Sequence, residues 1–247
     1  MSTTVRGRRY CIVDDFLPAS ELAAVRELAR GLTYEARDSV VDPVADGSAL
    51  RSRGAVLRRD EVLGQAGVPA AYRRVVGELA DHEDLVGTAG EDWSLVGMAF
   101  WKYLAGNRLG WHNDARPDRR GEFILFLHEE WSPSWGGELL VLDRDPDDLP
   151  PAPPELPTFA AIEHQVGETR DALVAVVPRP NRLVVVQEGT SHCIHRVDRT
   201  AGDHERWTMT GFVGSELAES PRVQDRSRLE RLAPFLAPTT PAPAGRQ

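Results

Sequence analysis

A histidine and an aspartate two positions apart are the residues of this chain best suited to chemistry. His112 and Asp114 close an apolar and aromatic stretch that begins at Trp101. In an extended backbone, residues i and i+2 point to the same side, so the imidazole and the carboxylate can converge on one point. They are two of the three protein ligands of a 2-His-1-carboxylate site, which holds Fe(II) and leaves coordination positions open. The pair therefore predicts part of a metal site, although the same motif also arises by chance in surface loops.

The third ligand of such a site has to be a histidine elsewhere in the chain. Four of the remaining histidines have less suitable surroundings. His82 lies near a predicted helix end and His128 follows an apolar run, whereas His164 lies in a proline-rich insertion and His204 in a charged turn. His192 and His195 instead follow the apolar run 183–186, at a turn that can return the chain toward a site. Residues three apart on an extended strand face opposite sides, so one of these two is expected to point inward. The residues alone leave that choice open.

Periodic patterns indicate which elements would position these ligands. Residues 10–16 are typical of a strand, and residues 21–30 and 69–82 carry apolar side chains at helical spacing. After residue 92 several strand-like runs follow one another, and residues 123–127 are apolar on both alternating faces, as in a strand buried on both sides. Helices ahead of a strand-rich half are typical of an α+β fold, here mainly β. Short strands joined by turns further indicate a sandwich or a double-sheet jelly roll.

The chain is expected to form one domain over residues 1–233. It divides into a helical and mixed support at 1–92, a jelly-roll core at 93–214 and a tail at 234–247, whose proline and alanine content predicts flexibility. The segment 144–172 is rich in proline and acidic residues, which cannot supply central strands, so it is predicted to be a loop insertion in the core. This insertion is either a lid or a passive excursion of the chain.

Composition and charge exclude several classes of function. The 247 residues carry a formal net charge of −9, which argues against nucleic-acid binding, because that relies on a positive surface. An apolar run of about eighteen residues, long enough to cross a membrane, does not occur, and the amino terminus lacks a secretory signal pattern. Cys11 and Cys193 form no disulfide framework and cannot make a cysteine-based zinc site. We therefore expect a soluble, cytoplasmic protein without a membrane partner. The sequence makes no prediction of the oligomeric state.

Five motifs occur in the order in which one enzyme family carries them. They are a tyrosine followed by His-x-Asp, a strand ending in Trp with Gly-Gly-Glu-Leu after it, a Pro-x-x-Asn-Arg-Leu-Val strand, His-x-Ile-x-x-Val, and Arg-x-Thr-x-Thr-Gly-Phe: residues 103–114, 123–139, 178–184, 192–197 and 206–212. Over residues 95–213 the chain thus resembles the Fe(II)/2-oxoglutarate-dependent dioxygenases, and within them the prolyl 4-hydroxylase-like branch. Each motif alone is weak, but five in this order are specific.

The resemblance implies a fold, a metal and a ligand set. The fold is a double-stranded β-helix, the cupin-like jelly roll, braced by the amino-terminal helices. The motif match selects His192 over His195, so His112, Asp114 and His192 are the expected catalytic metal ligands for Fe(II). With O2, enzymes of this family oxidise a substrate carbon and convert 2-oxoglutarate into succinate and CO2, and ascorbate can support the iron.

The resemblance also implies a site for the co-substrate 2-oxoglutarate. Its distal carboxylate would be bound by Arg206 and Thr208, two positions apart on one predicted strand, with Tyr103 as a further contact. The chain departs from the family at Phe126, where a tyrosine is often found, because phenylalanine cannot donate a hydrogen bond. The carboxylate of Asp114 argues for oxygenation, since the related halogenases lack it to make room for halide.

Substrate contacts are predicted for Arg116, Trp101 and Trp131, which lie close to the motifs in sequence. A solvated loop and ordinary packing are the plain alternatives for the arginine and the tryptophans. The predicted reaction is hydroxylation of an unactivated carbon in a small molecule, such as a free or carrier-bound amino acid or a natural-product intermediate. Alternatives at the same site are desaturation, epoxidation, cyclisation and hydroxylation of a protein residue such as proline. The rivals from other classes are a silent jelly-roll binding module and a zinc hydrolase, which would leave Arg206 without a role.

Overall fold

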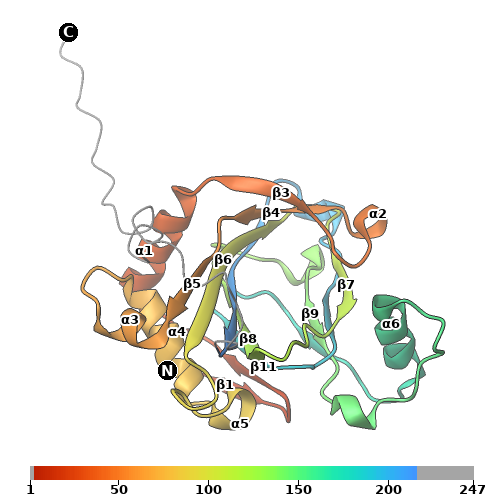
Figure 1. The fold of residues 1–247 in the computed structure, drawn as a ribbon. Helices are drawn as coiled ribbons and strands as arrows, with labels where there is room; N and C mark the ends of the chain where they lie inside the picture. The colour runs from red at the N-terminus through yellow and green to blue at the C-terminus, as the bar shows by residue number, and fades with distance from the viewer. Residues whose placement is uncertain (1–2, 216–247) are drawn as a thin grey trace.

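The computed structural model describes residues 3–215, and two β-sheets that face each other form the body of the molecule (Figure 1). The larger sheet has the order β1-β2-β11-β8-β13-β6-β4-β3, with β5 also paired to β6, and the smaller sheet has the order β10-β9-β12-β7. All of these pairings are antiparallel. The strands of the larger sheet are β1 Thr4–Arg6, β2 Tyr10–Val13, β3 Tyr34–Asp38, β4 Ser48–Ser52, β5 Ala55–Arg58, β6 Leu95–Tyr103, β8 Arg119–Phe126, β11 Leu183–Gln187 and β13 Arg206–Gly214. Those of the smaller sheet are β7 Leu109–His112, β9 Leu139–Val141, β10 Val174–Val176 and β12 His192–Ile194.

Strand β8 lies between two cores. Its Phe123 and Leu125 belong to a core shared with the helices, whereas Ile124 and Phe126 belong to a core shared with the smaller sheet. All four side chains are buried. Successive side chains of an extended strand point to opposite faces, so β8 is buried on both sides, as its sequence predicts. The same alternation sets which side chains of β8 face the space between the two sheets.

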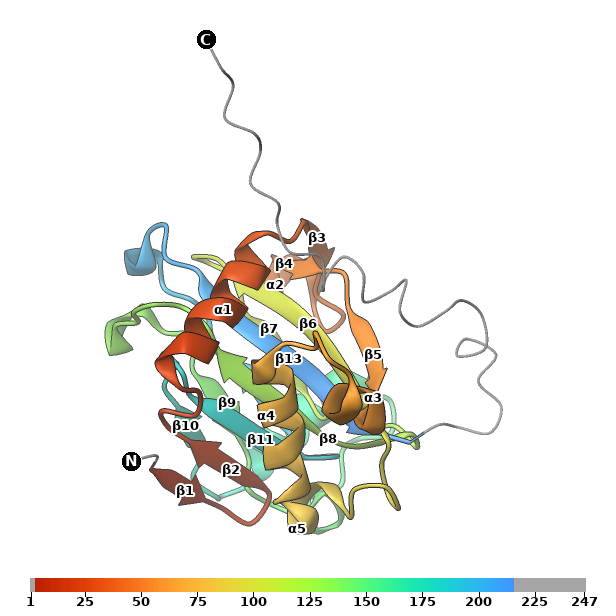
Figure 2. The same cartoon turned by 90° about the vertical axis from the view of Figure 1, so that its left-hand side faces the viewer.

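Helices cover the outer face of the larger sheet (Figure 2). They are α1 Ala19–Arg30, α3 Arg59–Gly64, α4 Ala70–Ala80 and α5 Glu83–Val86, and the short α2 Pro43–Asp46 lies between β3 and β4. The two longest, α1 and α4, correspond to the helices predicted at 21–30 and 69–82. Val75, Val76 and Leu79 of α4 are fully buried in the core that the helices share with the sheet. Because the helices occupy one face, the other face of the larger sheet is turned toward the smaller sheet.

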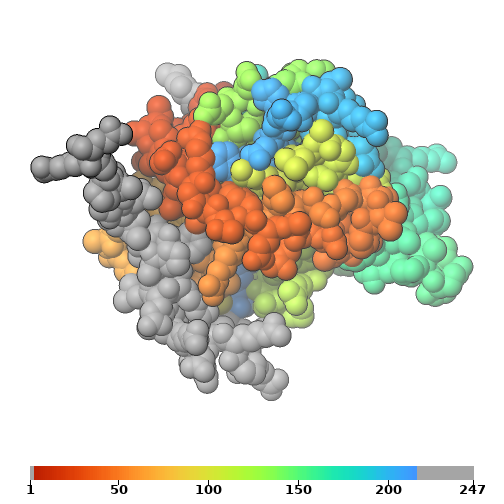
Figure 3. Space-filling view, turned by 90° about the horizontal axis from the view of Figure 1, so that it is seen from above, coloured from red at the N-terminus to blue at the C-terminus, as the bar shows by residue number. Residues whose placement is uncertain are grey.

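The predicted loop insertion 144–172 contains helical structure, namely the single turn η2 Pro146–Asp148 and the helix α6 Thr158–Glu168. Ile162 and Val166 of α6, one helical turn apart, are buried in a small cluster with Leu142. The helix lies beside β7 (Figure 1), and its segment stands out at the edge of the space-filling view (Figure 3). The expectation of a plain loop is corrected here, because the proline-rich part ends where α6 begins and the following residues have an apolar stripe of their own.

Two further 3-10 turns, η1 Pro133–Trp135 and η3 Arg199–Ala201, complete the described elements. Among residues 3–215, no helix combines the length and the apolar character needed to span a bilayer. The tail predicted at 234–247, and the end of the domain predicted at 1–233, lie outside the described residues.

Candidate metal centre

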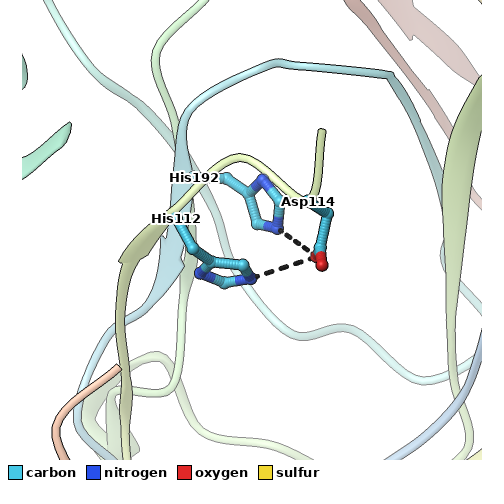
Figure 4. A group of neighbouring side chains, drawn as sticks. All are labelled: His112, Asp114 and His192. Carbon is cyan, nitrogen blue, oxygen red and sulfur yellow. Dashed lines mark ion pairs between the residues drawn. The ribbon is translucent and has the colours of Figure 1, made fainter. Parts of the chain in front are cut away.

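Two neighbouring strands of the smaller sheet bring together the three predicted metal ligands. His112 is the last residue of β7 and His192 is the first of β12, and the antiparallel register places these two residues opposite each other. Their ring centroids are 4.2 Å apart, and both Nε2 atoms point toward the carboxylate of Asp114 (Figure 4). The distances to Oδ2 of Asp114 are 3.3 Å from His112 and 3.9 Å from His192. One ligand atom from each of the three residues lies within 4.8 Å of the other two, which is compact enough for a single ion.

The backbone that presents Asp114 differs from the extended conformation that the His-x-Asp spacing suggests. β7 ends at His112, and Asp114 has a φ of 50°, in the left-handed region. This conformation costs about 1 kcal/mol for most residues, but aspartate tolerates it better than bulkier types. The carboxylate therefore reaches the histidines through a turn. His112 and Asp114 converge as predicted, but because of this left-handed turn and not because the backbone is extended.

Backbone carbonyls hold both imidazoles in the tautomer that metal binding needs. Nδ1 of His112 is 2.8 Å from the carbonyl oxygen of Gly110, and Nδ1 of His192 is 2.9 Å from that of Thr190. A carbonyl can only accept a hydrogen bond, so Nδ1 carries the proton in each ring. In each neutral ring the lone pair of Nε2 is then available to a metal ion, in the arrangement that metal-ligating histidines commonly show.

Arg119 holds the carboxylate of Asp114. Its Nη1 donates to Oδ1 of Asp114 over 2.8 Å, and its guanidinium lies over the ring of Phe212, 3.5 Å from the ring centroid. Burial by itself would raise the pKa of Asp114, but His112, His192 and Arg119 outweigh it and lower that pKa. Asp114 is therefore ionised at neutral pH and has one oxygen free to face the histidines.

The predicted co-substrate anchor is a buried cation in the larger sheet. Arg206 is 1% exposed, its Nε donates to the carbonyl of Gly137 over 2.6 Å, and its Nη2 is buried without a hydrogen-bond partner. Its guanidinium lies over the rings of Phe126 and Tyr103, at 4.9 and 5.6 Å from their centroids. Burial lowers the pKa of Arg206 to about 10, so the group stays charged at neutral pH. A buried guanidinium with a free N–H fits an incoming carboxylate.

Other polar groups surround this cation. Thr208 is two residues further along β13, is 1% exposed and accepts a hydrogen bond from Thr210. Tyr103 lies opposite Arg206 in the β6–β13 register, and burial raises the pKa of its phenol to about 12. His128 is also buried near Arg206, and neither ring nitrogen has a hydrogen-bond partner. Burial, followed by the charge of Arg206, lowers the pKa of His128 to about 3, so this imidazole is neutral.

The candidate substrate residues lie in different places. Trp101 is half-buried and stacks with Tyr103, and Trp131 donates from Nε1 to the carbonyl of Gly136 and packs against Trp135. Arg116 is exposed in the loop after Asp114. A pocket beside the metal ligands is lined by other residues: Asn113, Asp114, Arg119, Gly121, Glu122, Gln187, Glu188 and Phe212. Substrate contact by Arg116, Trp101 and Trp131 stays a prediction.

His195 is turned away from the metal ligands. It has an exposed side chain whose Nδ1 is 3.1 Å from the Glu138 carboxylate. The choice that the residues alone left open is thus decided by orientation, since only His192 of the two lies beside His112.

Sequence reasoning missed Glu122. This inward-facing residue of β8 is 6% exposed, and its Oε1 is 3.0 Å from Nε2 of His192. Burial would lower the pKa of His192, but the charge of Glu122 outweighs it and raises that pKa to about 9. The signal was present in the sequence, because Glu122 is the one acidic residue of β8 and directly precedes the apolar run 123–126.

Comparisons with known proteins agree with this geometry. Residues 98–214 match the model of the 2OG-Fe(II) oxygenase superfamily. A prolyl-4-hydroxylase of Pseudomonas putida is similar in structure, with a TM-score of 0.54 at 19% identity, over 85% of this chain and 94% of that one. A prolyl hydroxylase of Trichoplax adhaerens, solved with a peptide fragment of the hypoxia inducible factor oxygen degradation domain, is also similar in structure. Its TM-score is 0.53 at 13% identity, and the match covers 89% of this chain and 88% of that one. A comparison with curated protein sequences finds no match.

These findings confirm the predicted fold and family. The two antiparallel sheets form the double-stranded β-helix of the prolyl 4-hydroxylase-like enzymes. The superfamily uses Fe(II), 2-oxoglutarate and O2, and the donor set of two imidazoles, one carboxylate and a deeply buried guanidinium fits that requirement. Residues 98–214 of the chain form a 2OG-Fe(II) oxygenase domain, and the donor set within it is that of an Fe(II)/2-oxoglutarate-dependent dioxygenase.

Proposed function

We propose that this dioxygenase hydroxylates an unactivated carbon of a small molecule, with His112, Asp114 and His192 as the Fe(II) ligands. The observation that carries the assignment is the convergence of two Nε2 atoms and one carboxylate on a common point. Iron with 2-oxoglutarate and O2 supplies the oxidant for a C–H bond, with release of succinate and CO2. Two imidazoles and one carboxylate would hold the ion and leave coordination positions open for these reactants.

The protein's own part in this reaction is to bind, orient and exclude water. Arg206 provides a fixed fork for the distal carboxylate of 2-oxoglutarate, and Thr208 and Tyr103 offer hydroxyl groups beside it. Phe126 cannot take over the hydrogen bond of the tyrosine that the family often has, but its ring packs under the guanidinium. Because Arg206 and Thr208 are almost wholly buried, a carboxylate bound there is shielded from solvent.

Metal binding by the isolated protein tests the assignment. Mn(II) accepts the same ligands as Fe(II) and stays divalent in air, so isothermal titration of metal-free protein with Mn(II) gives a stoichiometry directly. One ion per chain is expected, and His112→Ala and Asp114→Ala should lose it while remaining folded. His195→Ala is the matched control, because it removes an exposed imidazole three residues from His192 and should bind as the unchanged protein does. Equal loss of binding in His195→Ala would contradict the assignment.

Substrate class is the second part of the proposal. A small molecule, free or carrier-bound, is favoured by the acidic and modest-sized chain. The similar Trichoplax adhaerens enzyme was solved with a peptide, so hydroxylation of a protein residue such as proline is the alternative. Succinate formation above the substrate-free rate, measured for metabolites and proline-containing peptides side by side, separates the two. Product mass then distinguishes hydroxylation from desaturation, epoxidation or cyclisation. A cytoplasmic location and support of the iron by ascorbate belong to the same proposal.

A further inference from the structure

Arg51 is a cation on the wall of the space between the two sheets. It lies on β4, opposite Trp101 of β6, and its guanidinium carbon is 5.2 Å from the centroid of the Trp101 ring. Trp101 stacks with Tyr103, whose ring lies under the guanidinium of Arg206. Because these side chains share one face of the larger sheet, Arg51 faces the same interior as the co-substrate anchor.

The charge of Arg51 has no partner in the described part of the chain. Its side chain is half-buried, and its Nε is buried without a hydrogen bond. Glu35 lies opposite it on β3, but the carboxylate of Glu35 accepts a hydrogen bond from Arg37 over 2.7 Å. Burial, followed by the charge of Arg37, lowers the pKa of Arg51, and no carboxylate among residues 3–215 offsets these effects. A guanidinium keeps its proton at neutral pH, so Arg51 is a cation in want of an anion.

The guanidinium of Arg51 extends away from the co-substrate anchor. A Cβ atom placed on Gly54 would be 3.0 Å from Nη2 of Arg51 and 3.6 Å from Cβ of Ala99, so the cation lies close to Ala99. Ala99 is opposite Thr210 of β13, four residues further along that strand than Arg206. The two arginines therefore occupy different levels of the sheet, and each can bind an anion of its own.

The metal ligands lie over the neighbouring part of β13. Arg119, which holds Asp114, is stacked on Phe212, two residues after Thr210. In the order of the larger sheet, β4 is two strands away from β13, which corresponds to about 10 Å. A substrate that offers a carbon to the metal can thus reach Arg51 with a group several bonds further along the molecule.

The space between the sheets is accessible to solvent on this side. Of the inward residues of β13, Arg206 and Thr208 are almost wholly buried, whereas Thr210 and Phe212 are half-buried. Accessibility therefore increases along the strand from the co-substrate anchor toward the metal ligands. The substrate is expected to enter where the inward side chains are accessible, and Arg51 lies beside that entrance.

We propose that Arg51 binds a carboxylate of the substrate, so that the enzyme oxidises small carboxylic acids at a carbon several bonds away from that carboxylate. The inference rests on the proposed function, and it narrows the substrate class from small molecules in general to acids, free amino acids among them. A guanidinium offers planar N–H donors that match the two oxygens of a carboxylate. The ring of Trp101 holds the guanidinium in place, which gives Trp101 a positioning role beside the substrate.

Matched pairs of compounds test the substrate class on the full-length, iron-loaded enzyme. The panel consists of the free amino acids and short straight-chain carboxylic acids, each beside its primary amide, and the readout is succinate above the substrate-free rate. At least one acid is expected to stimulate, with its amide about tenfold weaker or more, since hydrogen bonds between charged groups have effects of this order. A panel in which no acid stimulates, or in which the amides act equally well, overturns the inference.

Arg51→Met shows whether this residue carries the selectivity. It keeps the approximate length and removes the charge, so the Kd of the stimulating acid should rise by about tenfold or more, while that of its amide stays unchanged. Both values come from titration of protein loaded with Mn(II) and 2-oxoglutarate, which themselves should bind as they do to the unchanged protein. Arg74→Met, an equal change of charge on helix α4 at the outer face of the sheet, is the control and should alter none of these values.

The outcomes separate this inference from the function on which it rests. Failure of the unchanged protein to bind Mn(II) and 2-oxoglutarate contradicts the proposed function itself, and this inference with it. Normal binding of both, with an acid that Arg51→Met binds as tightly as the unchanged protein does, contradicts only the role of Arg51. A large loss of 2-oxoglutarate affinity in Arg51→Met also overturns that role, because this arginine would then serve the co-substrate.

Discussion

Replacing Arg206 by methionine tests the co-substrate site through two measurements that are expected to respond differently. Methionine has a similar length and no charge, so the packing against Phe126 and Tyr103 is largely kept. The affinity for 2-oxoglutarate should fall, since the distal carboxylate loses its fork. The stability of the protein without co-substrate should change little, because the removed charge is already without a full set of partners.

The structure allows both magnitudes to be worked out. Removing one partner of a buried, hydrogen-bonded charge pair costs about 2–5 kcal/mol. At about 1.4 kcal/mol per factor of ten, the Kd for 2-oxoglutarate should rise about 30- to 4000-fold. In the free protein, Arg206→Met loses the hydrogen bond to Gly137, worth about 1 kcal/mol, and relieves a guanidinium whose Nη2 is unpaired. The free energy of unfolding should therefore stay within about 1 kcal/mol of the unchanged protein or increase.

Titration of Mn(II)-loaded protein with 2-oxoglutarate gives the first value, and urea unfolding without co-substrate gives the second. Arg182→Met is the matched control, since Arg182 is a partly buried arginine whose guanidinium donates to Asp14 over 2.6 and 2.8 Å and has no proposed part in binding 2-oxoglutarate. It should lose about 3 kcal/mol of stability and leave the Kd unchanged. The reasoning is refuted if Arg206→Met behaves like this control, with a large loss of stability and an unaltered Kd.

Three further changes have expected results of different kinds. Arg119→Met should weaken Mn(II) binding by about 10- to 100-fold, measured by titration, because Asp114 loses the donor that orients it. The bonds from Arg182 lower the pKa of Asp14, so its stabilisation is present above the unfolded pKa and is lost as the pH falls through the folded one. Asp14→Asn should accordingly cost about 2 kcal/mol in urea unfolding at pH 7 and progressively less as the pH falls below about 4, the ordinary pKa of an aspartate, and a loss that does not change with pH would contradict the pairing. Gly211→Ala should destabilise the fold by about 3 kcal/mol or more, because its Cβ would lie 1.6 Å from a carbonyl oxygen of β6; a melting temperature close to that of the unchanged protein would disagree.

The spacing of apolar residues along the sequence predicted those helices and strands whose formation depends mainly on residues close together in the chain. The helices at 21–30 and 69–82 follow from apolar spacing, and β8 follows from an apolar run on both faces. The pair His112 and Asp114 could be picked out for the same reason, since two residues two apart stay close in almost any conformation. Asp114 nevertheless reaches its partner through a left-handed turn, which spacing does not reveal.

Helix α6 shows why the insertion was harder to predict. Its stripe of Ile162 and Val166 is short, and proline-rich residues before it make the whole segment resemble a loop. The helix is stabilised by burial against Leu142, which is distant from it in sequence. A short amphipathic segment needs such a surface to fold, and whether one is available depends on the rest of the chain.

The sequence by itself determined the donor types, the approximate strands and, through the order of five motifs, the family. Only the tertiary structure decided which side chains meet. His192 faces His112 because of the register between β7 and β12, and Arg119 turns back onto Asp114. Glu122 arrives beside His192 from the opposite sheet, where no short-range pattern could place it. The physical reason is that pairing across sheets depends on register and on the alternation of faces, and both are set by packing over the whole domain.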